Sequence, residues 1–167
     1  MDYMEQALSL AKLALGHVSP NPAVGAAVVK IDIVVGQGYT QPPGSWHAEV
    51  VALKQAGKEA QGSVMYVTLE PCCHYGRTPP CTQAIIAAGI TEVHLAILDA
   101  NPLVSGRGKD ELEREGIKVY LGEQEAAARK VNEAYTKFIT SGIPFVTAKF
   151  AISLDGKIAS KSGDSKW

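Results

Sequence analysis

The sequence has little of what marks membrane, secreted or nucleic-acid-binding proteins. Its formal net charge is −1 and aromatic residues make up only 7% of it, so no basic surface for nucleic acid is expected. No apolar run approaches the roughly 20 residues that a membrane span needs. Only three cysteines are present, and an odd number clustered in one stretch argues against a disulfide framework. We therefore expect a protein of the reducing cytoplasm, without nucleic-acid or membrane partners.

The 167 residues are enough for one well-packed domain, and they contain no internal repeats or low-complexity segments. The spacing of apolar residues predicts a helix over 2–17 and hairpin strands over 24–30 and 33–39. Further predicted helices span 47–56, 81–88, 109–115 and 123–140, and further predicted strands span 63–69, 92–98, 118–121 and 145–152. This order predicts an α/β fold of three layers, α/β/α, with a central mixed sheet between helices.

Candidate metal ligands stand in the cysteine-containing stretch 68–81 and at His47 upstream of it. Histidine nitrogen and cysteine thiolate suit Zn²⁺, and a catalytic zinc site takes three protein ligands and leaves one position for water. The candidate ligands are His47, Cys72 and Cys81. Glu49 follows His47 by two positions and could move protons without being a ligand. The pattern H-x-E followed by P-C-x-x-C is typical of zinc-dependent nucleobase deaminases.

The spacing of the two cysteines departs from that pattern, because eight residues separate Cys72 from Cys81 instead of two. Pro79 and Pro80 restrict the backbone of this longer loop, so both sulfurs can still reach one metal ion. All three ligands are predicted near helix starts, whose partial positive charge favours the thiolate over the thiol.

A structural zinc site is the alternative. Such a site takes four protein ligands, and Cys73 or His74 could supply the fourth. The cysteines could also be ordinary small apolar residues that bind no metal. Glu49 favours a catalytic site, because a closed structural site has no use for that carboxylate.

The string Glu-Pro-Cys-x-His-Tyr-Gly-Arg-Thr-Pro-Pro-Cys over 70–81, with His-Ala-Glu over 47–49, resembles the deaminase domain of the bifunctional riboflavin-biosynthesis deaminase/reductase. The long loop between the cysteines separates this family from cytidine, deoxycytidylate and tRNA-adenosine deaminases. The resemblance covers nearly the whole chain and implies a cytidine-deaminase-like fold, bound Zn²⁺ and a homo-oligomer. It implies hydrolytic deamination of 2,5-diamino-6-(5-phosphoribosylamino)pyrimidin-4-one, with Glu49 as the catalytic acid and base.

Several polar loop residues are candidate contacts for this pyrimidine nucleotide. Asn21, between two prolines, is either a turn residue or fixes a ribose or base edge. His74 and Arg77 are either solvated or bind substrate, and Arg77 suits a phosphate or carbonyl group. The glycine-containing basic loop 99–109 is either a plain loop or cradles an anion. The resemblance favours the functional choice for each. The predicted substrate contacts are therefore Asn21, His74, Arg77, Asp99 and Asn101.

The resemblance also divides the chain into a zinc-dependent deaminase domain over 1–143 and the truncated start of a reductase domain over 144–167. We expect no reductase activity and a mobile end, because the second segment is too short to form a core. Thr40 and Val51 depart from the family pattern near His47 and would affect substrate selection rather than zinc binding. Two rival functions are deamination of another base or nucleotide, such as cytidine or guanine, and a non-catalytic zinc-binding domain.

Overall fold

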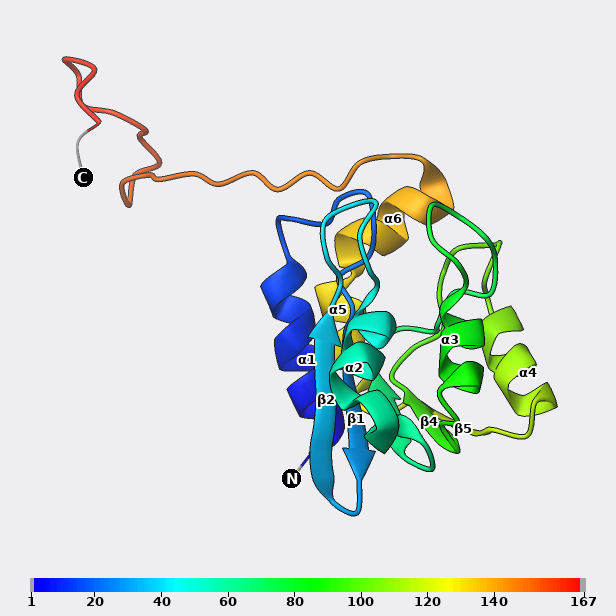
Figure 1. Ribbon diagram of the computed structural model, residues 1–167. Helices are drawn as coiled ribbons and strands as arrows, with labels where there is room; N and C mark the ends of the chain where they lie inside the picture. The colour runs from blue at the N-terminus through cyan, green and yellow to red at the C-terminus, as the bar shows by residue number, and fades with distance from the viewer. Residues whose placement is uncertain (1, 166–167) are drawn as a thin grey trace.

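The computed structural model describes residues 2–165, which form a five-stranded mixed sheet with helices on both faces and an extended C-terminal segment (Figure 1). The strands are β1 (Gly25–Lys30), β2 (Ile33–Tyr39), β3 (Val64–Val67), β4 (Glu92–Leu95) and β5 (Lys118–Leu121). Their order in the sheet is β2-β1-β3-β4-β5. Strand β1 pairs antiparallel with β2 and β3, whereas β3, β4 and β5 run parallel. The predicted mixed sheet is therefore confirmed.

Helices cover the sheet from both sides. They are α1 (Tyr3–Ala14), α2 (Ala48–Ala56), α3 (Cys81–Ala87), α4 (Arg107–Arg114), α5 (Glu125–Val131) and α6 (Glu133–Ser141), and a 3₁₀ turn, η1 (Gly57–Ala60), follows α2. Gly25 of β1 and Gly38 of β2 belong to neighbouring residue pairs of the β1–β2 hairpin, and they face opposite sides of the sheet. A Cβ atom added at Gly25 would lie 1.9 Å from the Ala7 carbonyl oxygen in α1, and one at Gly38 would lie 2.5 Å from the Ala48 carbonyl oxygen in α2. Because successive positions of a strand face opposite sides, α1 and α2 sandwich the hairpin, and the three-layer fold is confirmed.

The apolar core lies on both faces of the sheet and includes the parallel strands and the helices that follow them. Met65 and Val67 of β3 and Leu95 of β4 are fully buried against Ile85 of α3 and Leu112 of α4. Burying a side chain of this size stabilises a fold by roughly 1.5–3 kcal/mol. This packing fixes the ends of β3 and β4, from which the loops of the candidate site emerge.

Several predicted boundaries shift by two or three residues. Helix α1 ends at Ala14 rather than at residue 17, β4 ends at Leu95 rather than at residue 98, and α4 begins at Arg107 rather than at residue 109. Residues after β4 still bond to the segment after β3, since the Glu70 N–H donates to the Ile97 carbonyl at 3.0 Å, but no regular ladder continues.

The single helix predicted over 123–140 is instead two helices, α5 and α6, which meet at Asn132. Asn132 is only 2% exposed. Its Oδ1 accepts the Ala23 N–H at 2.9 Å and its side-chain amide donates to the Ala23 carbonyl at 3.0 Å. This pair ties both helices to the segment before β1. Helical spacing alone could not predict the break, because Ala23 lies 109 positions away in the chain.

The strand predicted over 145–152 is wrong. Figure 1 shows this segment leaving the body of the molecule after α6, and Val146 and Phe150 are 77% and 75% exposed. An extended segment needs a neighbouring strand to satisfy its backbone, and the one sheet formed by residues 2–165 does not include it. The outer limits of the two predicted domains, Met1 and Trp167, lie outside the described residues.

Within residues 2–165, no helix is long and apolar enough to cross a lipid bilayer.

Candidate metal centre and pocket

Three potential metal ligands converge beyond the end of β3. His47 is the N-cap of α2 and has an extended backbone, with φ −74° and ψ 162°. Cys81 is the first residue of α3, and Cys72 lies in the loop that joins β3 to α3. The ligand atoms of these three side chains all lie within 4.8 Å of one another. Within the described residues, neither Cys73 nor His74 belongs to this group, which is contrary to the four ligands of a structural zinc site.

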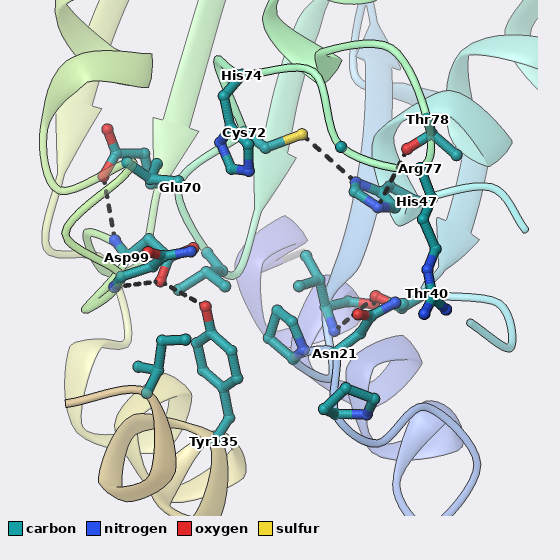
Figure 2. Close-up of a pocket in the computed structure, with 18 of the residues that line it drawn as sticks. Asn21, Thr40, His47, Glu70, Cys72, His74, Arg77, Thr78, Asp99 and Tyr135 are labelled. Atoms are coloured by element: carbon teal, nitrogen blue, oxygen red, sulfur yellow. Dashed lines mark hydrogen bonds between the residues drawn. The ribbon is translucent and has the colours of Figure 1, made fainter. Parts of the chain in front are cut away.

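The Nδ1 atom of His47 lies 3.2 Å from Cys81 Sγ and 3.5 Å from Cys72 Sγ. Figure 2 shows the contact between His47 and Cys72 as a dashed line. Two ligands of a tetrahedral zinc ion stand about 3.5 Å apart, given the usual Zn–N and Zn–S distances. The donor set therefore fits Zn²⁺. The other ring nitrogen, Nε2, lies 3.5 Å from the Thr78 hydroxyl oxygen, so Thr78 can help to orient the ring.

The prediction that all three ligands stand near helix starts is correct for His47 and Cys81 and wrong for Cys72. Cys72 reaches a helix start through space, because its Sγ accepts the backbone N–H of Cys81 at 3.4 Å. The hydrogen bond from the Cys81 thiol lowers the pKa of Cys72 to about 4, against the opposing effect of burial. The same bond, together with burial, raises the pKa of Cys81 well above its ordinary value. Cys81 must therefore lose a tightly held proton when a metal ion binds.

Glu49 lies beside this group, in the first turn of α2, and is 4% exposed. Burial raises the pKa of Glu49 to about 7, and the negative charge of Cys72 acts in the same direction. The extended backbone at His47 lets two residues that are two positions apart face one pocket, which a regular helix would not allow. A carboxyl group that exchanges its proton near neutral pH is suited to general acid and base catalysis.

A pocket of about 430 Å³ opens over the metal ligands, within the range typical of small-molecule sites (Figure 2). Eight of the nine predicted site residues line it, namely Asn21, His47, Glu49, Cys72, His74, Arg77, Asp99 and Asn101. Cys81 is the exception, because it is fully buried beneath the pocket floor. Residues predicted from four separate stretches of sequence are thus brought to one cavity.

The predicted substrate contacts differ in how free they are to bind a ligand. The Nδ1 atom of His74 is buried and has no hydrogen-bond partner among the described residues. The side chain of Arg77 is exposed at the rim, where a charged group of a ligand could reach it. Asp99 is already engaged, since its Oδ1 accepts the Asn101 N–H at 2.8 Å, and burial raises the pKa of Asp99.

One wall of the pocket, which the sequence did not indicate, is provided by Tyr135, Phe138 and Ile139 of α6. The Tyr135 hydroxyl donates to Asp99 Oδ1 at 2.9 Å. Glu70 and Thr78 also line the pocket and were not among the predicted site residues. The sequence signal for Glu70 is its position, because it is a carboxylate two residues before the candidate ligand Cys72.

The two departures from the family pattern that lie near His47 in the sequence, Thr40 and Val51, have different positions in the fold. Thr40 lines the pocket, but its hydroxyl oxygen accepts the Val24 N–H at 3.1 Å and so is already paired. Val51 packs against β2, because a Cβ atom added at Gly38 would lie 2.6 Å from the Cβ atom of Val51. Val51 is not one of the residues that line the pocket. Thr40 is therefore the departure that a substrate could contact directly.

A family model described as the cytidine and deoxycytidylate deaminase zinc-binding region matches residues 1–97, more than half of the chain. The chain belongs to this family. Membership confirms the cytidine-deaminase-like fold and, with the geometry of His47, Cys72 and Cys81, confirms Zn²⁺ as the metal of this site.

Riboflavin-biosynthesis proteins are among the most similar known proteins. The chain is 54% identical over 166 residues to the riboflavin biosynthesis protein RibD of Aquifex aeolicus, a match that covers 99% of this chain and 47% of that protein. The RibD structure from Acinetobacter baumannii, form 1, has a TM-score of 0.92 and 49% identity over 99% of this chain and 46% of that one. The chain thus spans about half the length of the curated relatives it matches.

A structure from Thermotoga maritima is similar over the same region. It is described as a diaminohydroxyphosphoribosylaminopyrimidine deaminase/5-amino-6-(5-phosphoribosylamino)uracil reductase. Its TM-score is 0.93 at 44% identity, and the match covers 99% of this chain and 48% of that one. The resemblance inferred from residues 47–49 and 70–81 therefore extends to the fold and to nearly all of the chain.

Proposed function

We propose that the chain is a zinc-dependent aminohydrolase of riboflavin biosynthesis. Its substrate would be 2,5-diamino-6-(5-phosphoribosylamino)pyrimidin-4-one, which loses one amino group as ammonia and becomes the 5-aminouracil nucleotide. The observation that carries this proposal is the buried Glu49, with a pKa of about 7, beside a three-ligand donor set at the floor of the pocket. The similarity to RibD of Aquifex aeolicus supports the choice of substrate.

The reaction needs a proton to move from water to the leaving amino group. His47, Cys72 and Cys81 would hold the zinc ion, which would supply a water activated at neutral pH. Glu49 takes the proton on a carboxylate oxygen and later gives it to the departing nitrogen. Its burial keeps this exchange inside the pocket, and its raised pKa lets it both accept and return a proton near pH 7.

The pocket residues would hold the nucleotide over this floor. The Nδ1 atom of His74, which has no hydrogen-bond partner within residues 2–165, could bind an edge of the base, and Asn21 offers an amide to the base or ribose. Arg77 at the rim suits the phosphate, because its guanidinium matches phosphate oxygens in pairs. Asp99 and Asn101 lie on the opposite wall, where they can contact the ribose.

The test is an ammonia-release assay on the zinc-loaded chain, with substrate made in situ from GTP by a GTP cyclohydrolase of the riboflavin pathway. Glu49→Gln preserves the size of the side chain and removes the titrating group. We expect it to keep one zinc ion and to lose about 10²- to 10⁴-fold in kcat, the usual worth of general acid and base catalysis. Normal deamination by Glu49→Gln would refute the proton-transfer role.

The same assay separates the rival functions. Turnover of cytidine or guanine but not of the diaminopyrimidine nucleotide would show a deaminase of different specificity. Full zinc occupancy without turnover of any of the three would favour a non-catalytic zinc-binding domain.

We further propose that residues 1–143 are the deaminase domain, that 144–167 begin a reductase domain, and that the chain acts in the cytoplasm as a homo-oligomer. The three cysteines are unpaired, which agrees with a reducing compartment. Phe138 and Phe145 are exposed apolar side chains near the point where the C-terminal segment leaves the fold, which agrees with a covered surface there. Sedimentation of the purified chain measures its oligomeric state.

A further inference from the structure

Glu70 is a buried carboxylate that neither the donor set nor the proton transfer uses. It is 3% exposed and stands two positions before Cys72, joined to it through Pro71. Its backbone N–H donates to the Ile97 carbonyl at 3.0 Å, so its main chain is anchored beyond the end of β4. A buried carboxylate is costly unless its oxygens accept hydrogen bonds, so its partners indicate what it does.

The partners of Glu70 are three backbone N–H groups of one loop, the segment 99–109. Its Oε2 accepts from Asp99 at 3.1 Å and from Gly106 at 2.9 Å, and its Oε1 accepts from Lys109 at 3.0 Å. Figure 2 shows the first of these bonds as a dashed line beside the pocket. One side chain therefore holds both ends of a loop that lies 29 to 39 positions later in the chain.

The second end of this loop is the start of α4. Gly106 is the N-cap of α4 and has no side chain with which to cap the first-turn N–H groups. Glu70 supplies the missing acceptor from another part of the chain. The close fit at this point requires glycine at position 108, because a Cβ atom there would lie 2.2 Å from the Pro71 carbonyl oxygen. The start of α4 is thus seated directly on the loop that carries Cys72.

The first end of the loop carries a predicted substrate contact. The Asp99 N–H is bound by Glu70, and the Asp99 carboxylate accepts bonds from the Asn101 N–H and the Tyr135 hydroxyl. The connection therefore runs from the metal-ligand loop through Glu70 to Asp99 and on to α6. Each member lines the pocket or abuts it.

We propose that Glu70 is a positioning residue that sets the spacing between the metal-ligand loop and the substrate loop 99–109. By this role it controls substrate affinity and leaves the chemical step at Glu49 largely untouched. The affinity part of the proposal rests on the deaminase function proposed above. The loop-holding part does not, because it concerns amide groups that can be observed without substrate.

The experiment compares the unsubstituted 167-residue chain with Glu70→Ala, Glu70→Gln and a matched control, Asp110→Asn. Asp110 is an exposed carboxylate in the first turn of α4, so its replacement removes the same charge near the same helix without removing an acceptor. Zinc content, kcat and KM from ammonia release, and hydrogen exchange of individual amides are measured for each variant. Only variants that bind one zinc ion are compared.

We expect Glu70→Ala to raise KM by about tenfold or more, since it leaves three N–H groups without their acceptor, while kcat changes by less than about threefold. The amides of Asp99, Gly106 and Lys109 should exchange faster. Glu70→Gln should restore part of the wild-type KM, because its one oxygen can still accept from Asp99 and Gly106. Asp110→Asn should match the wild type. If Glu70→Ala fails to fold, Glu70→Gln alone tests the proposal. A raised KM and faster exchange of the Lys109 amide in Glu70→Gln would support it.

Three results would overturn the proposal. They are unchanged exchange at the three amides, a loss confined to kcat, and a rise in KM in Asp110→Asn equal to that in Glu70→Gln. If the wild-type chain releases no ammonia, the proposed function fails, and the exchange of Asp99, Gly106 and Lys109 still decides whether Glu70 holds the loop.

Discussion

The floor of the pocket and its far wall are assembled from different kinds of residue. The floor consists of His47, Glu49 and Cys72, with Cys81 buried beneath it. These four residues come from two short stretches that each begin a helix or lead into one. The far wall consists of the loop with Asp99 and of Tyr135 on α6, which lies 36 positions further on. The floor contacts span 25 to 34 positions and the wall contact spans 36, so both depend on how distant elements pack. The two differ in their residue types, because those of the floor indicate metal chemistry in the sequence and those of the wall do not. Substitutions in the floor should abolish the chemistry, and substitutions in the wall should weaken substrate binding.

The largest effect should come from breaking the floor at the metal. Cys81→Ser removes a buried donor, and we expect the variant to lose zinc and all measurable ammonia release. Cys73→Ser is the matched control, because Cys73 lies next to Cys72 in the loop but outside the donor group. Metal analysis of the two purified variants checks this. An equal loss of zinc from Cys73→Ser would instead support a structural site with four protein ligands.

The second effect is a pH dependence that belongs to the floor alone. The hydrogen bond with Cys72 raises the pKa of His47 above its ordinary value of 6.5, and the pKa of Cys81 is raised as well. Both groups must be deprotonated to bind zinc, so protons compete more strongly as the pH falls. In the zinc-free chain, the protonated His47 contributes stability that is present below pH 6.5 and is lost as the pH rises through its raised folded pKa.

We therefore expect the difference in Tm between zinc-loaded and zinc-free chain to narrow between about pH 8 and about pH 6, where histidine titrates. Zinc affinity, measured by competition with a chelator, should fall over the same range. Cys72 should contribute less to this change than His47, because the hydrogen bond from the Cys81 thiol holds the pKa of Cys72 well below its ordinary value. A Tm difference that stays constant or widens towards acid pH would contradict this expectation.

The smallest effect should come from the wall. Tyr135→Phe removes the hydroxyl that donates to Asp99 and leaves the ring in place. We expect KM to rise by about threefold to tenfold, the worth of one net hydrogen bond, with kcat little changed. Tyr75→Phe is the control, because its hydroxyl bonds to Gln83 on the exposed side of the cysteine loop. A fall in kcat with unchanged KM would show that the wall takes part in the chemical step.

Much of the floor could be predicted from the sequence. The two-residue spacing of His47 and Glu49 and the proline-restricted loop between Cys72 and Cys81 carry the chemistry in their residue types. The alternation of helices and strands likewise indicated the mixed sheet, because periodicity reports which residues face a core. The prediction of a strand over 145–152 was wrong because it depends on a partner strand and not on local periodicity alone. Alternating apolar residues describe a strand only where another strand is present to pair with it.

The sequence by itself indicated the order of the elements and the residue types suited to Zn²⁺ and to proton transfer, because periodicity and side-chain chemistry can be recognised residue by residue. That His47 meets Cys72 and Cys81, 25 and 34 positions away, was decided by the fold. Only the tertiary structure decided that Glu70 would hold the loop 99–109, that Asn132 would divide the last helix, and that Tyr135 would reach Asp99. Each of these contacts joins residues that are 29 to 109 positions apart. Such contacts form only when the packed core has brought the elements together, since buried polar groups take whichever partner the fold places within reach.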